Sequence, residues 1–328
     1  MMEINMNIVV AGAAGFLGSH LCDALLSEGH FVIGVDNFLT GQFKNIDRIQ
    51  QQWSSKEFQF IEADVCNPIN FLQEIDFPEG KASIDQVYYL ASPASPIDYI
   101  KMPMETLYVG SFGCKNYLEL AQQFNARFLL TSTSEVYGDP TIHPQPESYW
   151  GNVNPIGPRS VYDESKRYAE SLTVAFHRYL GVEVRIARIF NPFGPRMRHD
   201  DGRVIPTFIK QALFNEPLTI FGDGSQTRSF CFFSDLVSGL ITLMNNEQSI
   251  GPFNLGNPHE LSMLELAQEI NTVLENSAGI VHKPLPLNDP TRRRPDLTKT
   301  EGTLGWSPKV SFADGIRETI EYFRDELL

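Results

Sequence analysis

Tyr162 and Lys166 stand four residues apart in the run YDESK, a spacing that places two side chains on one face of a helix. A tyrosine titrates near about pH 10, so its phenol is a poor base at neutral pH. A lysine ammonium close by stabilises the phenolate and lowers the pKa of the tyrosine. The pair therefore predicts removal of a proton from a hydroxyl group, provided that other features support a spacing that is common by chance.

A second group of polar side chains lies in STSEVYG, residues 132–138, directly after the apolar run Phe128 to Leu130. The run predicts a buried strand that ends just before Thr133 and Glu135. We expect these two side chains to converge on the same spot as Tyr162. The alternative for Glu135 is a structural carboxylate that pairs with a nearby lysine or arginine.

A glycine-rich turn near the N-terminus supplies a third component. Gly12, Gly15 and Gly18 form GxxGxxG between an apolar run and a helical pattern. Glycines there let backbone N–H groups approach a pyrophosphate at the helix N-terminus. Asp36 ends the next predicted strand, where a carboxylate accepts hydrogen bonds from both ribose hydroxyls and repels a 2′-phosphate. The pattern predicts a dinucleotide site for NAD rather than NADP.

The elements that must position these residues alternate along the first two thirds of the chain. Short β-rich runs separated by helical patterns predict a Rossmann-type, doubly wound α/β fold whose parallel sheet is covered on both faces. We expect strands at Asn7–Val10, Phe31–Val35, Phe58–Ile61, Val87–Leu90, Phe128–Leu130 and Val184–Ile189, and helices at Met104–Gln123 and Tyr162–Tyr179.

The composition of the sequence changes after Asn191, where Gly and Pro become frequent and the helical patterns become shorter. This change predicts an NAD-binding domain at residues 1–190 and a smaller substrate-binding lobe at residues 191–328. The apolar segment from Phe230 to Met244 is expected to return to the first domain, so residues 230–250 are assigned to it.

Composition excludes several classes of function. The chain has 328 residues and a net charge of −14, which argues against nucleic acid as a bulk partner. It contains no apolar stretch long enough for a membrane span and no secretion-signal pattern at its N-terminus. Its four cysteines are scattered without a CxxC pair, which predicts free thiols and no zinc site. We expect a soluble cytoplasmic protein without a metal.

With these residues in place, the chain resembles the extended short-chain dehydrogenase/reductases over essentially its whole length. Within that superfamily it is similar to the UDP-glucuronate decarboxylases, also called UDP-xylose synthases. The matching pieces are AGAAGFLGSHL, DNFLTG, YLASPASP, RFLLTSTSEVYGDP, HPQPESYWGNVNPIG, RIARIFNPFGPRM, DDGRV, SQTRSF and LGWSPKV. The resemblance implies NAD as cofactor, a nucleotide sugar as substrate and a homodimer that pairs the helices at Met104–Gln123 and Tyr162–Tyr179.

The resemblance also implies roles for individual residues. Thr133 holds the sugar 4-OH and relays its proton, Tyr162 is the base, and Lys166 binds the cofactor ribose and tunes the tyrosine. Glu135 lies next to C5, and Arg293 lies near the substrate carboxylate. The expected cofactor contacts are Gly12, Gly15, Phe16, Leu17, Gly18, Asp36, Asn37, Phe38, Thr40, Gly41, Asp64, Val65, Leu90, Ser92, Tyr162 and Lys166. The expected substrate contacts are Asn116, Asn191, Arg203, Arg228 and Arg293.

Glu135 distinguishes among the reactions of this superfamily. The related 4,6-dehydratases carry Asp-Glu after the threonine, and their Asp protonates the departing 6-OH. Here the pair is Ser134-Glu135, which fits chemistry at C5 without loss of water. Oxidation at C4 makes a ketone β to the C6 carboxylate, and such an acid loses CO2 when its enolate is stabilised at O4. C5 is then protonated and the hydride returns to C4, so no net oxidation occurs.

Several of these residues have a plainer interpretation. Asp64 is a candidate helix cap, and each of the two asparagines is a candidate for a helix or turn hydrogen bond. The run Thr291-Arg292-Arg293-Arg294-Pro295 is a candidate solvated face, although arginines suit diphosphate and carboxylate. The run His199-Asp200-Asp201 suggests a metal, but a loop is favoured because the chemistry needs none.

Three departures from the decarboxylase pattern concern substrate preference more than reaction type. The usual Lys-Thr-Asn is Tyr108-Val109-Gly110, the usual YDEGK is YDESK, and Pro192 replaces a threonine. A nucleotide-sugar 4,6-dehydratase and a uronate 4-epimerase remain as enzymatic alternatives. An NAD-binding scaffold or sensor remains as a non-enzymatic one. The nucleotide base, uridine or thymidine, follows from the resemblance alone.

Overall fold

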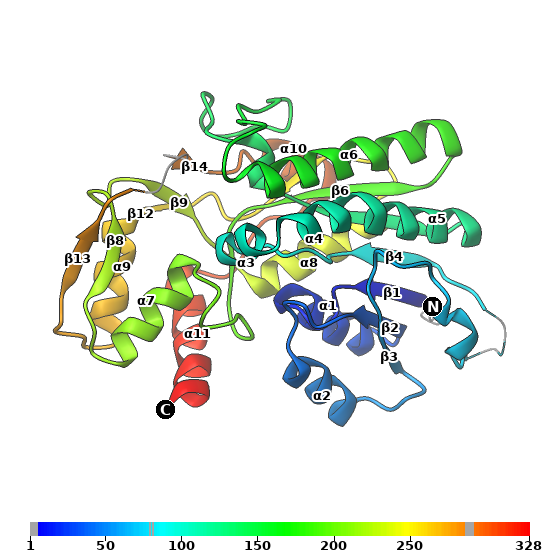
Figure 1. The fold of residues 1–328 in the computed structure, drawn as a ribbon, viewed down its shortest axis with the longest axis horizontal. Helices are drawn as coiled ribbons and strands as arrows, with labels where there is room; N and C mark the ends of the chain where they lie inside the picture. Colours follow the sequence, from blue (N-terminus) through cyan, green and yellow to red (C-terminus); the bar gives the residue numbers. More distant parts are fainter. Residues whose placement is uncertain (1–5, 79, 81, 286–291) are drawn as a thin grey trace.

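The computed structural model describes the whole chain except residues 1–5, 79, 81 and 286–291 (Figure 1). Its centre is a seven-stranded sheet in the order β11-β6-β5-β4-β1-β2-β3, and every neighbouring pair is parallel. The strands are β1 (Asn7–Ala11), β2 (Phe31–Asp36), β3 (Phe58–Glu62), β4 (Gln86–Tyr89), β5 (Arg127–Thr133), β6 (Val184–Ile189) and β11 (Phe253–Leu255). The predicted doubly wound fold is confirmed.

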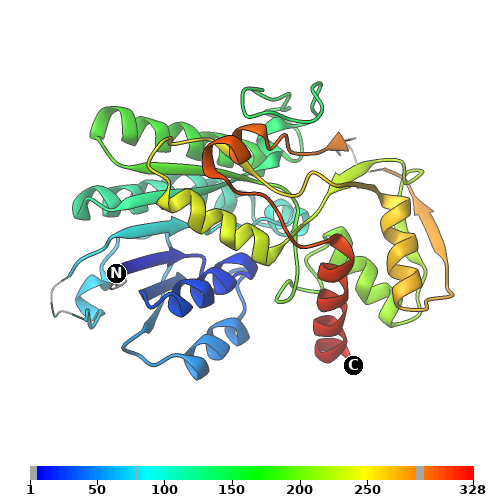
Figure 2. The same ribbon diagram turned by 180° about the vertical axis from the view of Figure 1, so that it is seen from behind.

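Helices cover both faces of this sheet (Figures 1 and 2). One face packs against α1 (Phe16–Ser27), α2 (Phe43–Gln52) and α8 (Phe233–Asn245). The other face packs against α5 (Cys114–Phe124) and α6 (Ser160–Leu180), and α4 (Pro103–Tyr108) packs on α6. Strands with apolar neighbours on both faces read as continuous apolar runs, which is why they were recognisable in the sequence.

The helix predicted at Met104–Gln123 is interrupted. A π-helical turn, η2 (Val109–Gly113), separates α4 from α5. The Tyr89 hydroxyl donates a 2.7 Å hydrogen bond to the Val109 carbonyl, which also accepts the Cys114 N–H five residues further along. A Cβ on Gly110 would lie 2.5 Å from the Ser165 Oγ, so the turn also permits close approach of α6.

The smaller lobe is built around a third apolar cluster and lies beside the carboxyl edge of the sheet (Figure 1). Its helices are α7 (Val204–Leu213), α9 (Met263–Val273) and α11 (Phe312–Leu327). Its short strands are β7 (Pro192–Phe193), β8 (Leu218–Phe221), β9 (Thr227–Ser229), β12 (Glu260–Ser262), β13 (Ile280–Lys283) and β14 (Arg292–Arg293), and β7 pairs with β10 (Cys231–Phe232), where the chain begins its return to the sheet.

Between these lobe elements, the chain goes back to the sheet. Helix α8 packs against α1, and β11 extends the sheet beside β6 (Figure 2). We propose on this basis that residues 1–190 and 230–250 form one domain, with β11 added to it. The remaining short helices are η1 (Phe71–Glu74), α3 (Pro96–Lys101), η3 (Ser134–Tyr137) and α10 (Thr298–Leu304).

Two features are absent from the residues that the structure describes. None of the helices seen there is both long and apolar enough to cross a bilayer. Within the same residues, no group of three or more His, Cys, Asp or Glu side chains could hold a metal ion. In the run that suggested a metal, Asp200 pairs with Arg198 and Asp201 pairs with Arg203.

Candidate active site

The carboxyl ends of the strands open onto one large cavity shared by the sheet and the smaller lobe. Its volume is about 1020 Å³. The lining residues come from the turn after β1, the end of β4, the end of β5, helices α3, α6 and α7, and strand β9. Parallel strands present their carboxyl ends at one edge, so residues distant in sequence meet there. Of the predicted catalytic residues, the cavity wall includes Thr133, Glu135, Tyr162, Lys166 and Arg293.

The glycine turn fits a dinucleotide pyrophosphate. Gly12 has φ of 92°, and a Cβ on it would lie 2.7 Å from the Ala91 backbone nitrogen. A Cβ on Gly18 would lie 2.0 Å from the Gly12 carbonyl oxygen. Helix α1 begins after Gly15 with no side-chain cap and no acidic residue in its first turn. Its first N–H groups therefore face the cavity side of the turn without a competing carboxylate, as an anion site requires.

Asp36 ends β2 beside this turn and is buried. Its carboxylate accepts N–H groups from Ala14 at 3.0 Å and Phe38 at 2.8 Å. A Cβ on Gly41 would lie 2.8 Å from an Asp36 carboxylate oxygen, so the loop packs tightly over it. A carboxylate held in this way can accept hydrogen bonds from two ribose hydroxyls and repels a 2′-phosphate.

The other predicted cofactor residues divide between two places. Phe16, Leu17, Thr40, Leu90 and Ser92 line the cavity. The remaining residues lie at or after the ends of β2 and β3, outside the cavity lining: Asn37, Phe38, Gly41, Asp64 and Val65. The Asp64 carboxylate accepts the Cys66 N–H at 2.8 Å, which is a turn contact rather than the cap of an α-helix. This second group suits the adenosine end of a dinucleotide.

Tyr162 and Lys166 project from α6 and are both buried. Burial raises the pKa of Tyr162 to about 12, although its hydrogen bond with Thr133 lowers it. Burial lowers the pKa of Lys166 to about 8, and its ammonium donates a 2.9 Å hydrogen bond to the Thr131 carbonyl. The phenol therefore needs added positive charge to act as a base near neutral pH, and an oxidised nicotinamide is such a charge.

Replacing Lys166 by Met should move the acidic limb of the pH–rate profile to higher pH. The base is active as phenolate, so the rate falls as the pH drops through the pKa of Tyr162. Loss of the neighbouring ammonium raises that pKa, and the limb moves upward with it. The measurement is kcat against pH for wild type and variant. An unmoved limb would contradict the tuning role.

Glu135 is held by two arginines. Arg293 donates to both carboxylate oxygens, at 2.5 and 2.9 Å, and Arg159 lies 3.0 Å away. Burial alone would raise the pKa of Glu135, but the charges of Arg293 and Arg159 lower it to about 2. The contacts of Glu135 are therefore those of the alternative interpretation, a carboxylate that pairs with nearby arginines. Its place on the cavity wall beside Thr133 makes it also a fixed anion next to any bound ligand.

The predicted substrate residues are only partly brought together. Arg203 and Arg228 line the cavity, and Arg203 is ion-paired with Asp201. Asn191 also lines it, with its amide donating to the Ser229 carbonyl at 2.8 Å.

Asn116 does not reach the cavity. It lies on α5, and its amide donates 3.0 Å hydrogen bonds to the carbonyls of Val65 and Asn67. These contacts match the second interpretation of Asn116, a structural hydrogen bond rather than a substrate contact. Because the amide is committed to the loop after β3, we propose no substrate contact for it.

Two of the cavity residues that were not identified from the sequence have side chains in contact with predicted catalytic residues. Arg159 is one, although its place three residues before Tyr162 could have indicated it. Tyr99 is the other: its ring stacks on the Tyr162 ring with centroids 5.1 Å apart and an interplanar angle of 8°. Only the packing of α3 against α6 reveals that contact.

Two departures from the decarboxylase pattern face each other. The usual Asn is Gly110 and the usual Gly is Ser165, and a Cβ on Gly110 would lie 2.5 Å from the Ser165 Oγ and 2.7 Å from its carbonyl oxygen. Gly110→Ala should therefore lower the free energy of unfolding by about 1–3 kcal/mol. Adding Ser165→Gly should recover part of that loss, because only the Oγ contact is relieved. Urea unfolding of the three proteins measures this, and a neutral Gly110→Ala would refute it.

Comparison with known proteins agrees with this geometry. A family model described as GDP-mannose 4,6 dehydratase matches residues 9–319. UDP-glucuronic acid decarboxylase 2 of Arabidopsis thaliana is 52% identical over 322 residues, which are 98% of this chain and 69% of that protein. UDP-glucuronic acid decarboxylase 1 of Danio rerio is 50% identical over 321 residues, which are 98% of this chain and 73% of that protein.

The chain belongs to the UDP-glucuronic acid decarboxylase family. Its fold is that of the wider extended short-chain dehydrogenase/reductases. The UDP-glucuronic acid 4-epimerase from Bacillus cereus, solved in complex with UDP-glucuronic acid and NAD, superposes with a TM-score of 0.84 at 30% identity. The match covers 98% of this chain and 100% of that chain. Because epimerases share the fold, the fold alone does not select the reaction, and the site residues must.

Proposed function

We propose that this protein is an NAD-dependent carboxy-lyase that converts UDP-glucuronate to UDP-xylose. The observation that carries the proposal is the wall formed by Thr133, Glu135 and Tyr162, in which position 134 is a buried serine. The carboxylate beside C5 is present, and the acid that a dehydratase needs for expelling water is absent. Identity of about half over 98% of the chain to curated UDP-glucuronic acid decarboxylases supports the same reaction.

The chain's own residues perform the proton chemistry at O4. Tyr162 takes the proton of the 4-OH through Thr133, and the two side chains then hold O4 as the ketone forms. Bound NAD would supply a hydride acceptor for C4 and, once CO2 has left, the donor that returns the hydride. Thr133 and Tyr162 remain as hydrogen-bond donors to O4 while electrons from the departing carboxylate collect there. That stabilisation of the enolate is the main task of the site.

The fixed charge of Glu135 limits what it can do at C5. A carboxylate with a pKa of about 2 is ionised at neutral pH, so it has no proton to give to C5. We infer that it orients a water that supplies the proton. As a fixed anion it also disfavours a charged substrate carboxylate relative to neutral CO2, while Arg293 and Arg159 offer the carboxylate its binding site. Arg228 suits the diphosphate.

NAD fits the cradle of Gly12, Gly18 and Asp36, and Lys166 suits the nicotinamide ribose. The four cysteines, Cys22, Cys66, Cys114 and Cys231, are free thiols, which supports a reducing compartment such as the cytoplasm.

Product analysis after incubation with UDP-glucuronate tests the proposal. Decarboxylation gives CO2 and a UDP-pentose, identified by mass. Epimerisation gives a uronate with all its carbons and an inverted C4. Dehydration would need a substrate with a free 6-OH, so UDP-glucose is offered in a parallel reaction. A protein that binds NAD but turns over none of these would be a scaffold or sensor, and the proposal would be wrong.

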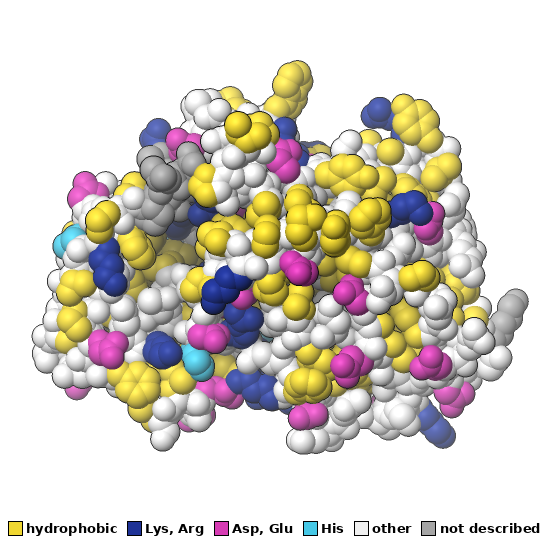
Figure 3. Space-filling model, viewed as in Figure 1, with side chains coloured by type: hydrophobic (Ala, Val, Ile, Leu, Met, Phe, Trp, Pro, Cys, Tyr) yellow, Lys and Arg dark blue, Asp and Glu magenta, His cyan; other side chains and the backbone are white. Residues whose placement is uncertain are grey.

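We also propose a homodimer through the helices that cover one face of the sheet. Side chains at helical spacing on this face are exposed: Ile100, Met104, Tyr108 and Phe112, with Tyr168 on α6. Figure 3 shows hydrophobic side chains gathered in the centre of this face. Apolar patches of this kind are typical of subunit interfaces.

Replacing Phe112 by Asp should convert the dimer to a monomer, because a charge would be buried in the apolar contact. Sedimentation velocity measures the change. Phe214→Asp is the matched control, since Phe214 is about equally apolar and exposed but follows α7 in the smaller lobe. A wild-type monomer, or a Phe112→Asp dimer, would contradict the interface.

A further inference from the structure

Helix α3 connects the two sides of the cavity through adjacent residues. Asp98 and Tyr99 follow each other on this helix, and both are buried. Tyr99 faces α6, where its ring stacks on Tyr162. Asp98 faces the segment 194–203, which runs from the sheet edge to α7 in the smaller lobe. A movement of α3 would therefore act on Tyr162 and on this segment together.

The stack with Tyr99 is the feature that fixes the plane of the Tyr162 ring. The rings are almost parallel, at 8° and 5.1 Å between centroids, which is within the range of attractive aromatic pairs. Tyr99 is 1% exposed, and its hydroxyl has no hydrogen-bond partner among the residues that the structure describes. The Tyr99 hydroxyl therefore does not fix the position of the ring. That position depends on the contacts that fix helix α3.

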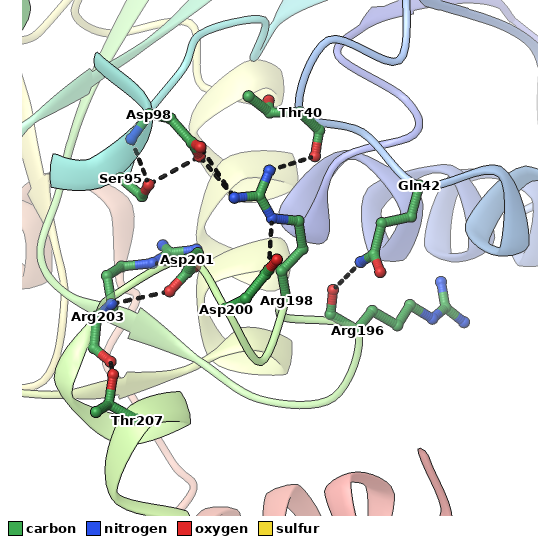
Figure 4. Close-up of polar contacts among 10 residues, drawn as sticks. All are labelled: Thr40, Gln42, Ser95, Asp98, Arg196, Arg198, Asp200, Asp201, Arg203 and Thr207. Atoms are coloured by element: carbon green, nitrogen blue, oxygen red, sulfur yellow. Dashed lines mark hydrogen bonds and ion pairs between the residues drawn. The ribbon is translucent and has the colours of Figure 1, made fainter. Parts of the chain in front are cut away.

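An ion pair across the cavity mouth holds α3. Arg198 donates to both carboxylate oxygens of Asp98, at 2.9 and 3.0 Å (Figure 4). Ser95 adds a 2.8 Å hydrogen bond to the same carboxylate. Arg198 also reaches the Thr40 carbonyl at 3.4 Å and pairs with Asp200. Bidentate pairs of this kind have fixed geometry and are stronger than single contacts.

The segment that carries Arg198 is itself anchored at several points. Gln42 donates to the Arg196 carbonyl at 3.1 Å (Figure 4). Arg196 pairs with Asp23 on α1 at 2.6 Å. Asp201 is paired with Arg203 just before α7. The guanidinium of Arg198 is thus presented to Asp98 by a segment tied to the glycine-turn helix, the loop after β2 and the smaller lobe.

We propose that Tyr99 is a positioning residue for the base Tyr162 and that the Asp98–Arg198 ion pair keeps Tyr99 in place. The inference rests on the proposed function, because it assigns the base to Tyr162. It makes the position of the base depend on contact between α3 and the segment 194–203. When that contact is closed, the phenol lies against a flat, buried ring and can adopt only one orientation toward Thr133.

The charges around Tyr162 determine how its titration should respond. Glu135 of η3 and Asp163 of α6 disfavour the phenolate, Arg203 favours it, and the ammonium of Lys166 lies one helical turn further along. From α3 the phenol meets an uncharged ring, and the charge of Asp98 is balanced by Arg198. Tyr99 therefore acts by excluding water rather than by charge. Removing its ring admits water, stabilises the phenolate and lowers the pKa of Tyr162.

The first test compares Tyr99→Phe with Tyr99→Leu. Phe keeps the stack, so kcat and the pH profile should stay within about twofold of wild type. Leu removes it, and kcat should fall on the order of 10- to 100-fold, as expected for a displaced base, with KM changed little. The acidic limb of the kcat profile should move to lower pH. Loss of folded protein alone would lower the rate without moving the limb.

A spectroscopic titration tests the same role of Tyr99 without substrate turnover. The ultraviolet difference between each NAD-loaded protein and its Tyr162→Phe counterpart isolates the phenolate of Tyr162. Its midpoint should be lower in Tyr99→Leu than in wild type and Tyr99→Phe. Equal midpoints would overturn the inference. Failure of wild type to make a UDP-pentose would overturn the proposed function instead, and the titration would still decide the role of Tyr99.

A double-mutant cycle tests the ion pair. Asp98→Asn and Arg198→Met should each lower kcat, and the double variant, which leaves neither charge unbalanced, should shift the Tyr162 midpoint in the direction of Tyr99→Leu. The double variant should be no worse than the poorer single variant, since either change breaks the same pair. NAD affinity is measured for all three, because Arg198 also contacts the loop of Thr40. Additive effects, or an unshifted midpoint in every variant, would show that the pair does not hold Tyr99.

Discussion

Tyr162→Phe should lower kcat for UDP-glucuronate by on the order of 10³-fold while leaving the fold intact. In the proposed mechanism the phenol accepts the 4-OH proton, and general acid–base catalysis contributes about 10²–10⁴-fold. Phe keeps the stack with Tyr99, so the loss can be assigned to the hydroxyl. KM should change little, because the hydroxyl acts mainly as the substrate is oxidised. Steady-state kinetics measured by product mass provides both constants.

Tyr168→Phe is the matched control. Tyr168 lies on the same helix but is about half exposed, and its hydroxyl is not part of the cavity wall. It should behave as wild type. If Tyr162→Phe turned over near the wild-type rate, another group would be the base and the assignment would be wrong.

Glu135→Gln should have two effects of different origin. Activity should fall by about 10²-fold or more, because the anion that orients the proton donor at C5 is lost. The free energy of unfolding should fall by about 3 kcal/mol, because Arg293 and Arg159 lose the carboxylate they share. Arg293 is almost fully buried, so water cannot replace the missing charge. Urea unfolding and product assays measure the two effects separately.

The stability difference between wild type and Glu135→Gln should depend on pH in one direction. The folded-state pKa of about 2 lies below the ordinary value of 4.5, so the carboxylate contributes its full stability above pH 4.5. That contribution is lost as the pH falls from 4.5 toward 2. Glu164→Gln, which removes an exposed carboxylate 3.6 Å from Arg167, should leave stability nearly unchanged. Equal stability of Glu135→Gln and wild type at pH 7 would contradict the buried ion pair.

The parts of the molecule that depend on local pattern could be predicted from the sequence. The β-strands are continuous apolar runs because both faces of the sheet are covered, and each predicted run became a strand. The glycine turn and the YDESK helix are short-range features, because the residues that define each of them lie close together in the sequence. The family resemblance then assigned residues such as Glu135 and Arg293, which lie 158 positions apart in the chain.

The parts that depend on contacts between distant elements could not. Nothing near Tyr99 indicates that its ring lies on Tyr162, and nothing near Arg198 indicates Asp98, since both contacts arise from how α3 packs. The π-turn over Val109–Gly113 was not predicted, and the hydroxyl that bonds to it comes from β4, which is distant in the sequence. For Asn116 the sequence left two interpretations, because an asparagine on a helix can face either a ligand or a loop, and only packing decides between them.

The central claim is that a transient ketone at C4 is the electron sink for loss of the neighbouring carboxylate. UDP-glucuronate labelled with deuterium at C4 and carbon-13 at C6 tests it most directly, with products analysed by mass. The account predicts that labelled CO2 is released and that the UDP-pentose keeps the deuterium at C4, because the same hydride is removed and returned. A pentose without deuterium, or a product that retains the carbon-13, would contradict it.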